Sequence, residues 1–436
     1  MKQFYDFFKY HQETKHSYHS VRVFPNRLDW NNQPSTLKNY PQNYKRIDLN
    51  TNLDNHNFLY LIAGVNAKKV YPTVEYYLRV NPSAGALYPN EIYFQVRNED
   101  GFEDGIYHFE ISSSNATLLY KLKEDEGIEG NLEFDGSYDG FIFFISSVYY
   151  RSSWKYKNRA FRYCLLDAGH ILGSIEASSY LFDKEFSIIY DFNREKLNRL
   201  FAFDEKEFFN SLVLCAKKTN ASKNPILLDL PTVDGLKVEQ NSKEEIFEKN
   251  ELIENAYLLS SKINNKIVQL HKANFVYNKE LFKETIFKRR SIRGFSNKSI
   301  SKVEYESILN VLNQAITSDC DEQIDIYYVV NRVENMPVGL YKNGKLIKKG
   351  DFKSKAGYLC LEQDLGSSSA VTFYLTSKDK NYQALYQKAG IIGHRLYLAS
   401  NYMQIGCSGI GAYYDDEVCE FIDEYCMVLY SLAIGN

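Results

Sequence analysis

The chain repeats part of its own sequence, and no other feature limits its possible folds as strongly. The segment EIYFQVRNEDGFEDGIYHF, from residue 91, resembles DIYYVVNRVENMPVGLYKN, from residue 325, with Ile92 opposite Ile326. Both segments predict a strand, a turn and a second strand. Further along, three pairs of residues align at one constant offset: Ala168 with Ala389, Gly169 with Gly390, and Ser187 with Ser408. The two halves of the chain are therefore expected to fold in the same way.

Each copy predicts a domain of mixed strands and helices. Apolar residues at helical spacing mark one long helix per copy, around Leu166 and around Ile392. A helix that is apolar almost all round is typical of a core or of a dimer interface. We therefore expect an α+β fold, with two tandem α/β domains over residues 1–216 and 243–436 that form a pseudo-dimer. Residues 217–242 lack periodicity and contain Pro and Asn, so they predict a linker.

The composition is that of an ordinary globular protein, with 44% hydrophobic and 25% charged residues. The net charge of -3 favours neither nucleic acid nor an anionic membrane surface as a partner. The first twenty residues lack the apolar segment of a signal peptide, and no stretch approaches the ~20 apolar residues of a membrane helix. The seven cysteines never form C-x-x-C, which favours reduced thiols in the cytoplasm. No metal-ligand spacing is present.

Basic residues cluster just before a predicted helix of the second copy. The segment RRSIRGF places three arginines and a hydroxyl within five residues: Arg289, Arg290, Ser291 and Arg293. Guanidinium groups bind phosphate oxygens in bidentate fashion and keep their charge, so this arginine cluster suits a phosphate group. A basic surface loop is the alternative interpretation. The next helix is expected to begin with a capping box, Ser301 and Glu304.

The corresponding segment of the first copy, ETKHSYHSVR, resembles the arginine cluster only loosely. It offers Lys15, His16 and Ser17, and Arg22 is displaced. The first copy instead has a loop of mostly small residues directly before a predicted strand: Pro82, Ser83, Ala84, Gly85, Ala86 and Leu87. The second copy has ITSDCDEQ there, with Asp319 among its carboxylates.

Two further segments occur in one copy only. Lys155-Tyr156 belongs to the first copy, and Gly409-Ile410-Gly411 belongs to the second. The copies have thus lost complementary parts, as expected if one composite site at their interface survives. In the alternative interpretation, Lys155 and Tyr156 pack at a strand end, with Arg159 and Arg162 on a solvated helix face. The histidines at 170 and 394 are expected to be interior residues and not catalytic ones.

These segments together resemble the nitroreductase-type flavoproteins. Within them, the chain resembles the SagB/ThcOx-type dehydrogenases, which are FMN oxidases of azole-forming peptide maturation. The resemblance covers nearly the whole chain as a tandem duplication. It is carried by RRSIRGF, NPSAGALYPNEIYF, WKYKNRAFRYCLLDAGH and GIGAYYDD. PSAGALYP followed by GIYHF is a specific signal, whereas RRSxR alone is a weak one.

The resemblance implies an FMN dimer fold with the flavin at the subunit interface. The arginine cluster would hold the ribityl phosphate, and Gly409, Ile410 and Gly411 would form a turn near N5 and the pyrimidine edge. The loop from Pro82 to Leu87 would lie along the isoalloxazine, because small residues let the backbone approach a flat ring. Lys155 and Tyr156 would be the catalytic pair that takes a proton from the substrate.

The activity implied by this resemblance is azoline dehydrogenation, the oxidation of a thiazoline or oxazoline to its azole in a ribosomally made peptide. The modified peptide would be the partner, and a cyclodehydratase complex is a further candidate partner. Two alternatives remain open. The first is an NAD(P)H-dependent flavin reductase acting on dehydroalanine, enone or nitro substrates. The second is a flavin-less scaffold subunit, which the retained arginines, loop and glycines disfavour.

Overall fold

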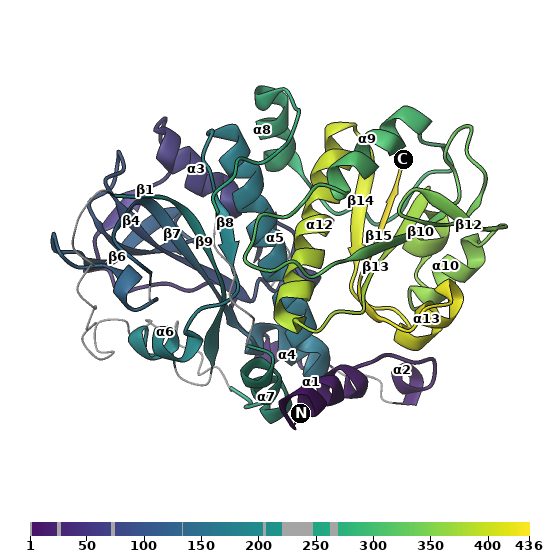
Figure 1. Ribbon diagram of the computed structural model, residues 1–436, viewed down its shortest axis with the longest axis horizontal. Coiled ribbons are helices and arrows are strands. Elements are labelled where there is room, and N and C mark those ends of the chain that lie inside the picture. The colour runs from purple at the N-terminus through teal and green to yellow at the C-terminus, as the bar shows by residue number, and fades with distance from the viewer. Residues whose placement is uncertain are drawn as a thin grey trace. The chain divides into compact units, whose positions relative to one another are not determined.

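The computed structural model describes residues 2–23, 28–70, 75–132, 134–203, 206–219, 247–261 and 269–436 (Figure 1). The chain divides into two compact units. The central unit comprises Leu28–Asn274 and Thr317–Cys320. The terminal unit comprises Met1–Arg27, Phe275–Ile316 and Asp321–Asn436.

The N-terminal segment does not follow the predicted domain boundaries. Residues 2–23 belong to the terminal unit, although the repeat predicts them in the first domain. The ring of Tyr10 lies edge-on to that of Tyr382, with centroids 6.0 Å apart, and Lys15 Nζ lies 2.7 Å from Asp416 Oδ1. The prediction assumed that each copy stays together in space, and these contacts show otherwise for its first residues. The predicted linker lies outside the described residues from residue 220 onward.

The central unit is built on a seven-stranded sheet in the order β1-β6-β5-β4-β7-β9-β8, in which all neighbouring strands are antiparallel. The strands are β1 Arg46–Asp48, β4 Asn90–Arg97, β5 Gly105–Glu110, β6 Asn115–Lys121, β7 Tyr138–Val148, β8 Ser187–Ile189 and β9 Glu207–Lys218. A separate ribbon pairs β2 Val65–Val70 with β3 Glu75–Arg79.

The terminal unit contains a six-stranded antiparallel sheet in the order β12-β11-β10-β13-β15-β14. Its strands are β10 Asp325–Val330, β11 Gly339–Lys342, β12 Lys345–Lys349, β13 Val371–Ser377, β14 Gly406–Ile410 and β15 Met427–Gly435.

Six strands of the central sheet have counterparts in the same order in the terminal sheet. The series β6-β5-β4-β7-β9-β8 corresponds to β12-β11-β10-β13-β15-β14. Residues aligned in the sequence repeat fall on these counterparts, since Ile92 pairs with Ile145 of β7 and Ile326 pairs with Leu375 of β13. The two related sequences therefore give sheets of the same topology.

Each unit has one long helix that packs on its sheet. Helix α5 (Ala160–Leu181) contacts β7 and β9, and helix α12 (Tyr382–Tyr402) contacts β14 and β15. Both helices are buried along nearly their whole length, which confirms the expectation from their apolar pattern. The other helices of the central unit are α3 Asp54–Ala63, α4 Tyr150–Tyr156, α6 Arg194–Leu200 and α7 Glu251–Leu259.

The remaining helices belong to the terminal unit. They are α1 Lys2–Glu13, α2 Ser20–Val23, α8 Lys279–Lys288, α9 Lys302–Leu312, α10 Lys353–Leu359, α11 Asp364–Ser368 and α13 Asp415–Ile422. The predicted capping box is present at α9, where Ser301 Oγ accepts from the amide of Glu304 and the Glu304 carboxylate accepts from the amide of Ser301.

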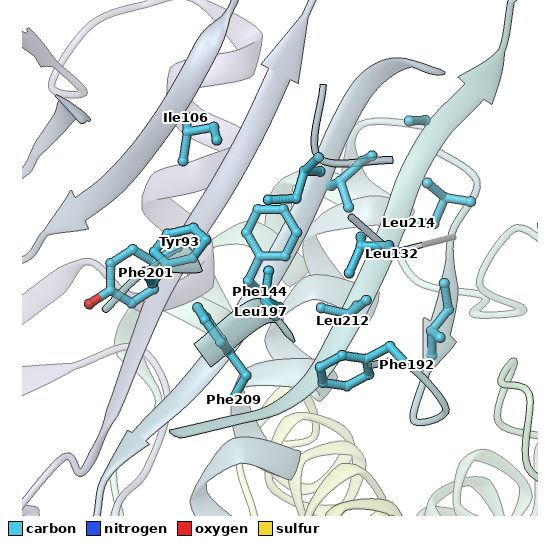
Figure 2. Packing of buried hydrophobic residues seen from close by; sticks show 14 of the residues in the cluster. Tyr93, Ile106, Leu132, Phe144, Phe192, Leu197, Phe201, Phe209, Leu212 and Leu214 are labelled. Carbon is cyan, nitrogen blue, oxygen red and sulfur yellow. The ribbon is translucent and has the colours of Figure 1, made fainter. Parts of the chain in front are cut away.

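One apolar cluster of the central unit lies on one face of its sheet. Figure 2 shows Tyr93, Phe144 and Phe209 of three neighbouring strands packed with Leu197 and Phe201. The rings of Tyr93 and Phe201 have centroids 5.3 Å apart. Residues that alternate along the strands thus fill one apolar layer. In the part of the chain that the structure describes, no helix combines the length and apolar character needed to cross a membrane.

Candidate functional site

The small-residue loop of the central unit has a strained backbone. Two of its residues and Tyr88, which follows the loop directly, lie in the left-handed region, with φ of 64° at Gly85, 55° at Ala86 and 43° at Tyr88. Glycine adopts this conformation freely, but alanine and tyrosine do so at a cost of roughly 1–3 kcal/mol each. A loop of this kind persists only where its surroundings fix it, and such loops cluster at functional sites.

Asp167 of α5 is one of the groups that fix the loop. Its carboxylate accepts hydrogen bonds from Ser83 Oγ at 2.5 Å and from the amide of Ala84 at 3.2 Å. Ser83 Oγ in turn accepts from the amide of Tyr88 at 2.9 Å, which closes the loop. Burial raises the pKa of Asp167 to about 7, although the hydrogen bonds from the loop act in the opposite direction. The sequence prediction did not include this residue.

A buried charge network holds the end of the loop. Arg151 of α4 donates to the Tyr88 carbonyl at 3.0 Å and lies 2.5 Å from Glu91. Glu91 also contacts His108 at 3.0 Å, and its pKa is well below the usual range despite burial, because the Arg151 charge favours the carboxylate. The Arg79 guanidinium lies over the Tyr88 ring, 4.4 Å from its centroid. Tyr88 is therefore held by both its backbone and its ring.

Lys155 and Tyr156 end helix α4 and face the small-residue loop. A Cβ on Gly85 would lie 2.7 Å from Tyr156 Oη and 3.0 Å from Lys155 Nζ. Gly85 thus provides space for two polar side chains, in addition to its left-handed φ. The structure therefore brings the predicted catalytic pair together with the predicted flavin loop within one unit.

The alternative interpretation of this region is wrong in two respects. Strand β7 ends at Val148, so Lys155 and Tyr156 lie at the end of a helix and not at a strand end. Arg159 and Arg162 are 4% and 1% exposed, so they do not lie on a solvated helix face.

In the terminal unit, the arginine cluster lies against β14. Arg289 follows α8 and is only 3% exposed, with its guanidinium 5.3 Å from the centroid of the Tyr397 ring. Arg290 donates to the Arg289 carbonyl at 2.6 Å. Ser291 forms a parallel bridge with Cys407 of β14. Arg293 is exposed. The arginines of the cluster therefore differ in exposure: Arg289 is buried and Arg293 is exposed.

Tyr397 of α12 joins this cluster to the predicted glycine segment. Its hydroxyl lies 2.8 Å from Ser291 Oγ and accepts from the amide of Gly409 at 2.6 Å. Tyr397 was not among the predicted site residues, and its place in a helix with many aromatic residues gave no signal. The structure thus brings Ser291 and Gly409 together through a single buried tyrosine.

The glycine segment is not the turn that was expected. Gly409 and Ile410 belong to strand β14, and Gly411 follows it. Among the described glycines, those with φ in the left-handed region do not include Gly409 or Gly411. The reason for glycine at 409 is instead a close approach, because a Cβ there would lie 2.0 Å from Tyr430 Oη.

The two histidines of the long helices are interior residues, as expected. His170 and His394 are each 1% exposed. Burial lowers the pKa of His394 to about 3, and the positive charge of Arg289 acts in the same direction. His394 is therefore neutral near pH 7 and does not gain a proton in the physiological range.

The residues that replace the arginine cluster in the first copy are engaged elsewhere in the terminal unit. Lys15 pairs with Asp416 at 2.7 Å, and Arg22 pairs with Glu362 at 2.6 Å. Asp319, which was expected in place of a flavin-facing loop, has a structural contact in the central unit. Its carboxylate accepts from the amides of Tyr190 and Asp191, the latter at 2.8 Å.

The predicted site residues therefore form two clusters. The loop from Pro82 to Leu87 gathers with Lys155 and Tyr156 in the central unit. The arginine cluster gathers with Gly409 in the terminal unit. Each cluster is anchored by a residue that the sequence prediction missed, Asp167 in the first and Tyr397 in the second.

Comparison with known proteins gives matches of three kinds: to a family model, to protein sequences and to solved structures. Residues 286–428 match the model of the nitroreductase family. A putative nitroreductase of Methanocaldococcus jannaschii is 30% identical over 121 residues, which are 27% of this chain and 57% of that protein, so little more than half of the relative is matched. A crystal structure of a putative nitroreductase from Anabaena variabilis is 25% identical, covers 99% of both chains and has a TM-score of 0.78.

Proposed function

We propose that this chain, whose matches support the nitroreductase superfamily, is an FMN-dependent oxidoreductase that dehydrogenates azolines in a ribosomally made peptide. The family match and the full-length structural likeness support the superfamily and an oxidoreductase activity. The observation that carries the proposed reaction is the convergence of Lys155 Nζ and Tyr156 Oη on Gly85. A strained loop beside an amine and a phenol is the arrangement expected where a proton is removed from a bound substrate.

FMN fits the chemistry of the residues present. Its phosphate is a dianion, and Arg290, Ser291 and Arg293 offer two guanidiniums and a hydroxyl, with buried Arg289 adding positive charge. Its flat ring suits a loop of small side chains, and Gly85 leaves open the space that a Cβ would fill. We therefore retain the small-residue loop and Gly409, Ile410 and Gly411 as proposed ring contacts, and the arginine cluster as the proposed phosphate site.

When bound, FMN supplies hydride-accepting chemistry. Conversion of an azoline to an azole also requires removal of a proton from Cα. We assign that proton to Lys155 Nζ in its neutral form, and we assign Tyr156 Oη to hydrogen bonding beside it. Asp167 and Arg151 hold the loop against this pair, so they are positioning residues and not catalytic ones.

We expect one FMN per chain, because neither sequence copy has a complete set of flavin-binding residues. This follows from the proposed tandem duplication, in which the first copy has lost the arginine cluster and the second copy the small-residue loop. A peptide substrate, a cyclodehydratase complex as partner and a cytoplasmic location remain parts of the proposal.

Substitution of Arg293 by alanine is expected to weaken FMN binding. The loss of one charge-assisted phosphate contact costs about 1.5–3 kcal/mol, or about tenfold to a hundredfold in affinity. Arg22→Ala is the matched control, because Arg22 pairs with Glu362 and Tyr414 and is expected to leave the affinity unchanged. Flavin fluorescence titration of the apoprotein measures both. Equal losses in the two variants, or two flavins per chain, would contradict the single-site proposal.

The raised pKa of Asp167 predicts a pH-dependent stability. The pKa of Asp167 is about 7 in the folded state and near 3.9 in the unfolded state. Between these values the folded state binds the proton more tightly, so the contribution of Asp167 to the free energy of unfolding is complete below about pH 4 and is lost as pH rises to about 7. Asp167→Asn removes this titration. The free energy of unfolding of the variant, relative to that of the wild type, is therefore expected to rise between pH 4 and 8 by up to about 4 kcal/mol.

Urea unfolding at a series of pH values measures this difference. Asp100→Asn, which makes the same substitution at an exposed position, is the control. A difference between Asp167→Asn and the wild type that stays constant from pH 4 to 8 would show that burial does not govern this carboxyl.

The proposed reaction is tested by mass spectrometry of a thiazoline-containing peptide incubated with the purified protein. Each ring oxidised to an azole loses two hydrogens, or ~2 Da, as hydride transfer and proton removal require. If the peptide is unchanged but NAD(P)H bleaches the flavin, the reductase alternative gains support. A colourless protein that binds no added FMN supports the scaffold alternative.

A further inference from the structure

Two cysteines of the terminal unit lie side by side at the end of helix α13. Cys419 Sγ is 3.5 Å from Cys426 Sγ and 3.2 Å from the Cys426 carbonyl oxygen. Cys419 lies in the last part of α13, and Cys426 directly precedes β15. The two cysteines are seven positions apart in the sequence, which matches no metal or redox motif, so the sequence analysis did not single out this pair.

The helix end itself brings the two thiols together. Asp423 adopts the left-handed conformation with φ of 58°, which reverses the chain after α13. The amide of Asp423 donates to the Glu420 carbonyl at 3.2 Å, and the amide of Glu424 donates to the Cys419 carbonyl at 3.0 Å. These two bonds form the common glycine-type helix cap, here with aspartate at its left-handed position. The thiols are therefore held close by backbone geometry.

The pair is also more accessible than the other cysteines. Cys419 and Cys426 are partly exposed, beside the exposed residues Glu420 and Tyr425. The other cysteines are buried: Cys164, Cys215, Cys320, Cys360 and Cys407. Burial raises the pKa of Cys360 to about 11 and that of Cys215 to about 12, which makes them poor nucleophiles. A small reagent thus has two accessible thiols, and these are neighbours.

The two thiols are not equivalent. A hydrogen bond from Cys426 lowers the pKa of Cys419 and outweighs burial, which raises it; the nearby Lys15 charge also lowers the pKa, and Asp416 raises it. The same contact with Cys419 raises the pKa of Cys426, and Glu424 adds to that effect. Cys419 is therefore the thiol that more readily becomes a thiolate, and the thiolate is the attacking form.

We propose that Cys419 and Cys426 are a thiol–disulfide exchange site that reacts with small disulfides of the glutathione class. The Cys419 thiolate attacks one sulfur of the disulfide, which forms a mixed disulfide and releases the first small thiol. Cys426 then loses its proton and attacks the Cys419 sulfur, which releases the second. Two protein thiols are oxidised to one intrachain disulfide, and one small disulfide is reduced to two thiols.

This disulfide would join the end of α13 to the start of β15. Helix α13 begins at Asp415, whose carboxylate accepts from the amide of His16 at 2.9 Å, and Asp416 pairs with Lys15. The exchange site is thus on the helix that holds the N-terminal segment. It is independent of the proposed flavin chemistry, since neither cysteine belongs to the proposed site.

The test is intact-mass and peptide-mapping spectrometry of the reduced full-length protein after exposure to oxidised glutathione. The wild type is expected to lose ~2 Da and to yield one cross-linked peptide that contains both cysteines. Cys426→Ser is expected to retain one glutathione on Cys419, because the second attack is missing. Cys419→Ser is expected to react at Cys426 at least tenfold more slowly. Cys320→Ser, which alters a buried cysteine, is the matched control and is expected to behave as the wild type.

Addition of glutathione to several cysteines, or a loss of ~2 Da that persists in Cys419→Ser, would overturn the proposal. A second measurement needs no substitution, so it holds even if a variant folds poorly. Brief treatment of the reduced wild type with iodoacetamide is expected to label Cys419 first and to abolish the later loss of mass with oxidised glutathione. Labelling that begins at one of the buried cysteines would contradict the assignment.

Discussion

Replacement of Lys155 by methionine is expected to lower azoline turnover by about 10²- to 10⁴-fold, the usual contribution of a general base. Methionine keeps the length and the packing of the aliphatic chain but cannot take a proton. The flavin content is expected to stay at the wild-type level, because Lys155 lies outside the arginine cluster. Mass spectrometry of azole formation measures the turnover, and the visible absorbance of the flavin measures the flavin content.

Lys157→Met is the matched control for this prediction. Lys157 lies two residues further along, is exposed, and donates from Nζ to the Trp154 carbonyl at 3.1 Å instead of facing Gly85. It is expected to change turnover by less than about threefold, since it contributes one exposed hydrogen bond. If Lys155→Met turns over azoline at the wild-type rate, the assignment of the base is wrong.

Gly85→Ala is expected to reduce turnover by roughly 10²-fold, through displacement of both members of the Lys155-Tyr156 pair. The new Cβ would lie 2.7 Å from Tyr156 Oη, which is too close for an unshifted side chain. The left-handed φ of 64° adds a backbone cost of roughly 1–2 kcal/mol for a residue with a Cβ. Both turnover and the free energy of unfolding are therefore expected to fall.

Gly344→Ala separates these two effects. Gly344 has a φ of 87°, so alanine there meets a similar backbone cost, but a Cβ would have no other atom within 4 Å. It is expected to lose stability like Gly85→Ala and to keep full turnover. Equal turnover in the two variants would show that the space beside Gly85 is not needed for the reaction.

The elements with strong local signals could be predicted from the sequence. The long helices α5 and α12 have apolar residues on nearly every side, and this pattern permits little except burial. The capping box of α9 requires only Ser301 and Glu304 at a fixed spacing. The position of Lys155 and Tyr156 beside the small-residue loop followed from a family resemblance and not from spacing, because those segments lie some seventy residues apart.

The anchors of the site could not be predicted, because they depend on contacts between distant segments. Asp167 and Ser83 are 84 residues apart in the chain. The one available signal was that Asp167 is a lone aspartate in the apolar segment CLLDAGH. A carboxyl buried there needs hydrogen-bond donors from another part of the chain. The alternative interpretation put Arg159 and Arg162 on a solvated helix face, as is usual for arginine, but both are buried.

The N-terminal segment has a consequence for the order in which the protein folds during synthesis. Lys15 leaves the ribosome 401 residues before its partner Asp416. At 5–20 residues per second, the segment waits roughly 20–80 s for the helix that it contacts. All of the central unit is synthesised in that interval and can fold first. The terminal unit, which includes residues before and after the central unit, is therefore expected to be completed after it, and α1 stays without its partner helix during this delay.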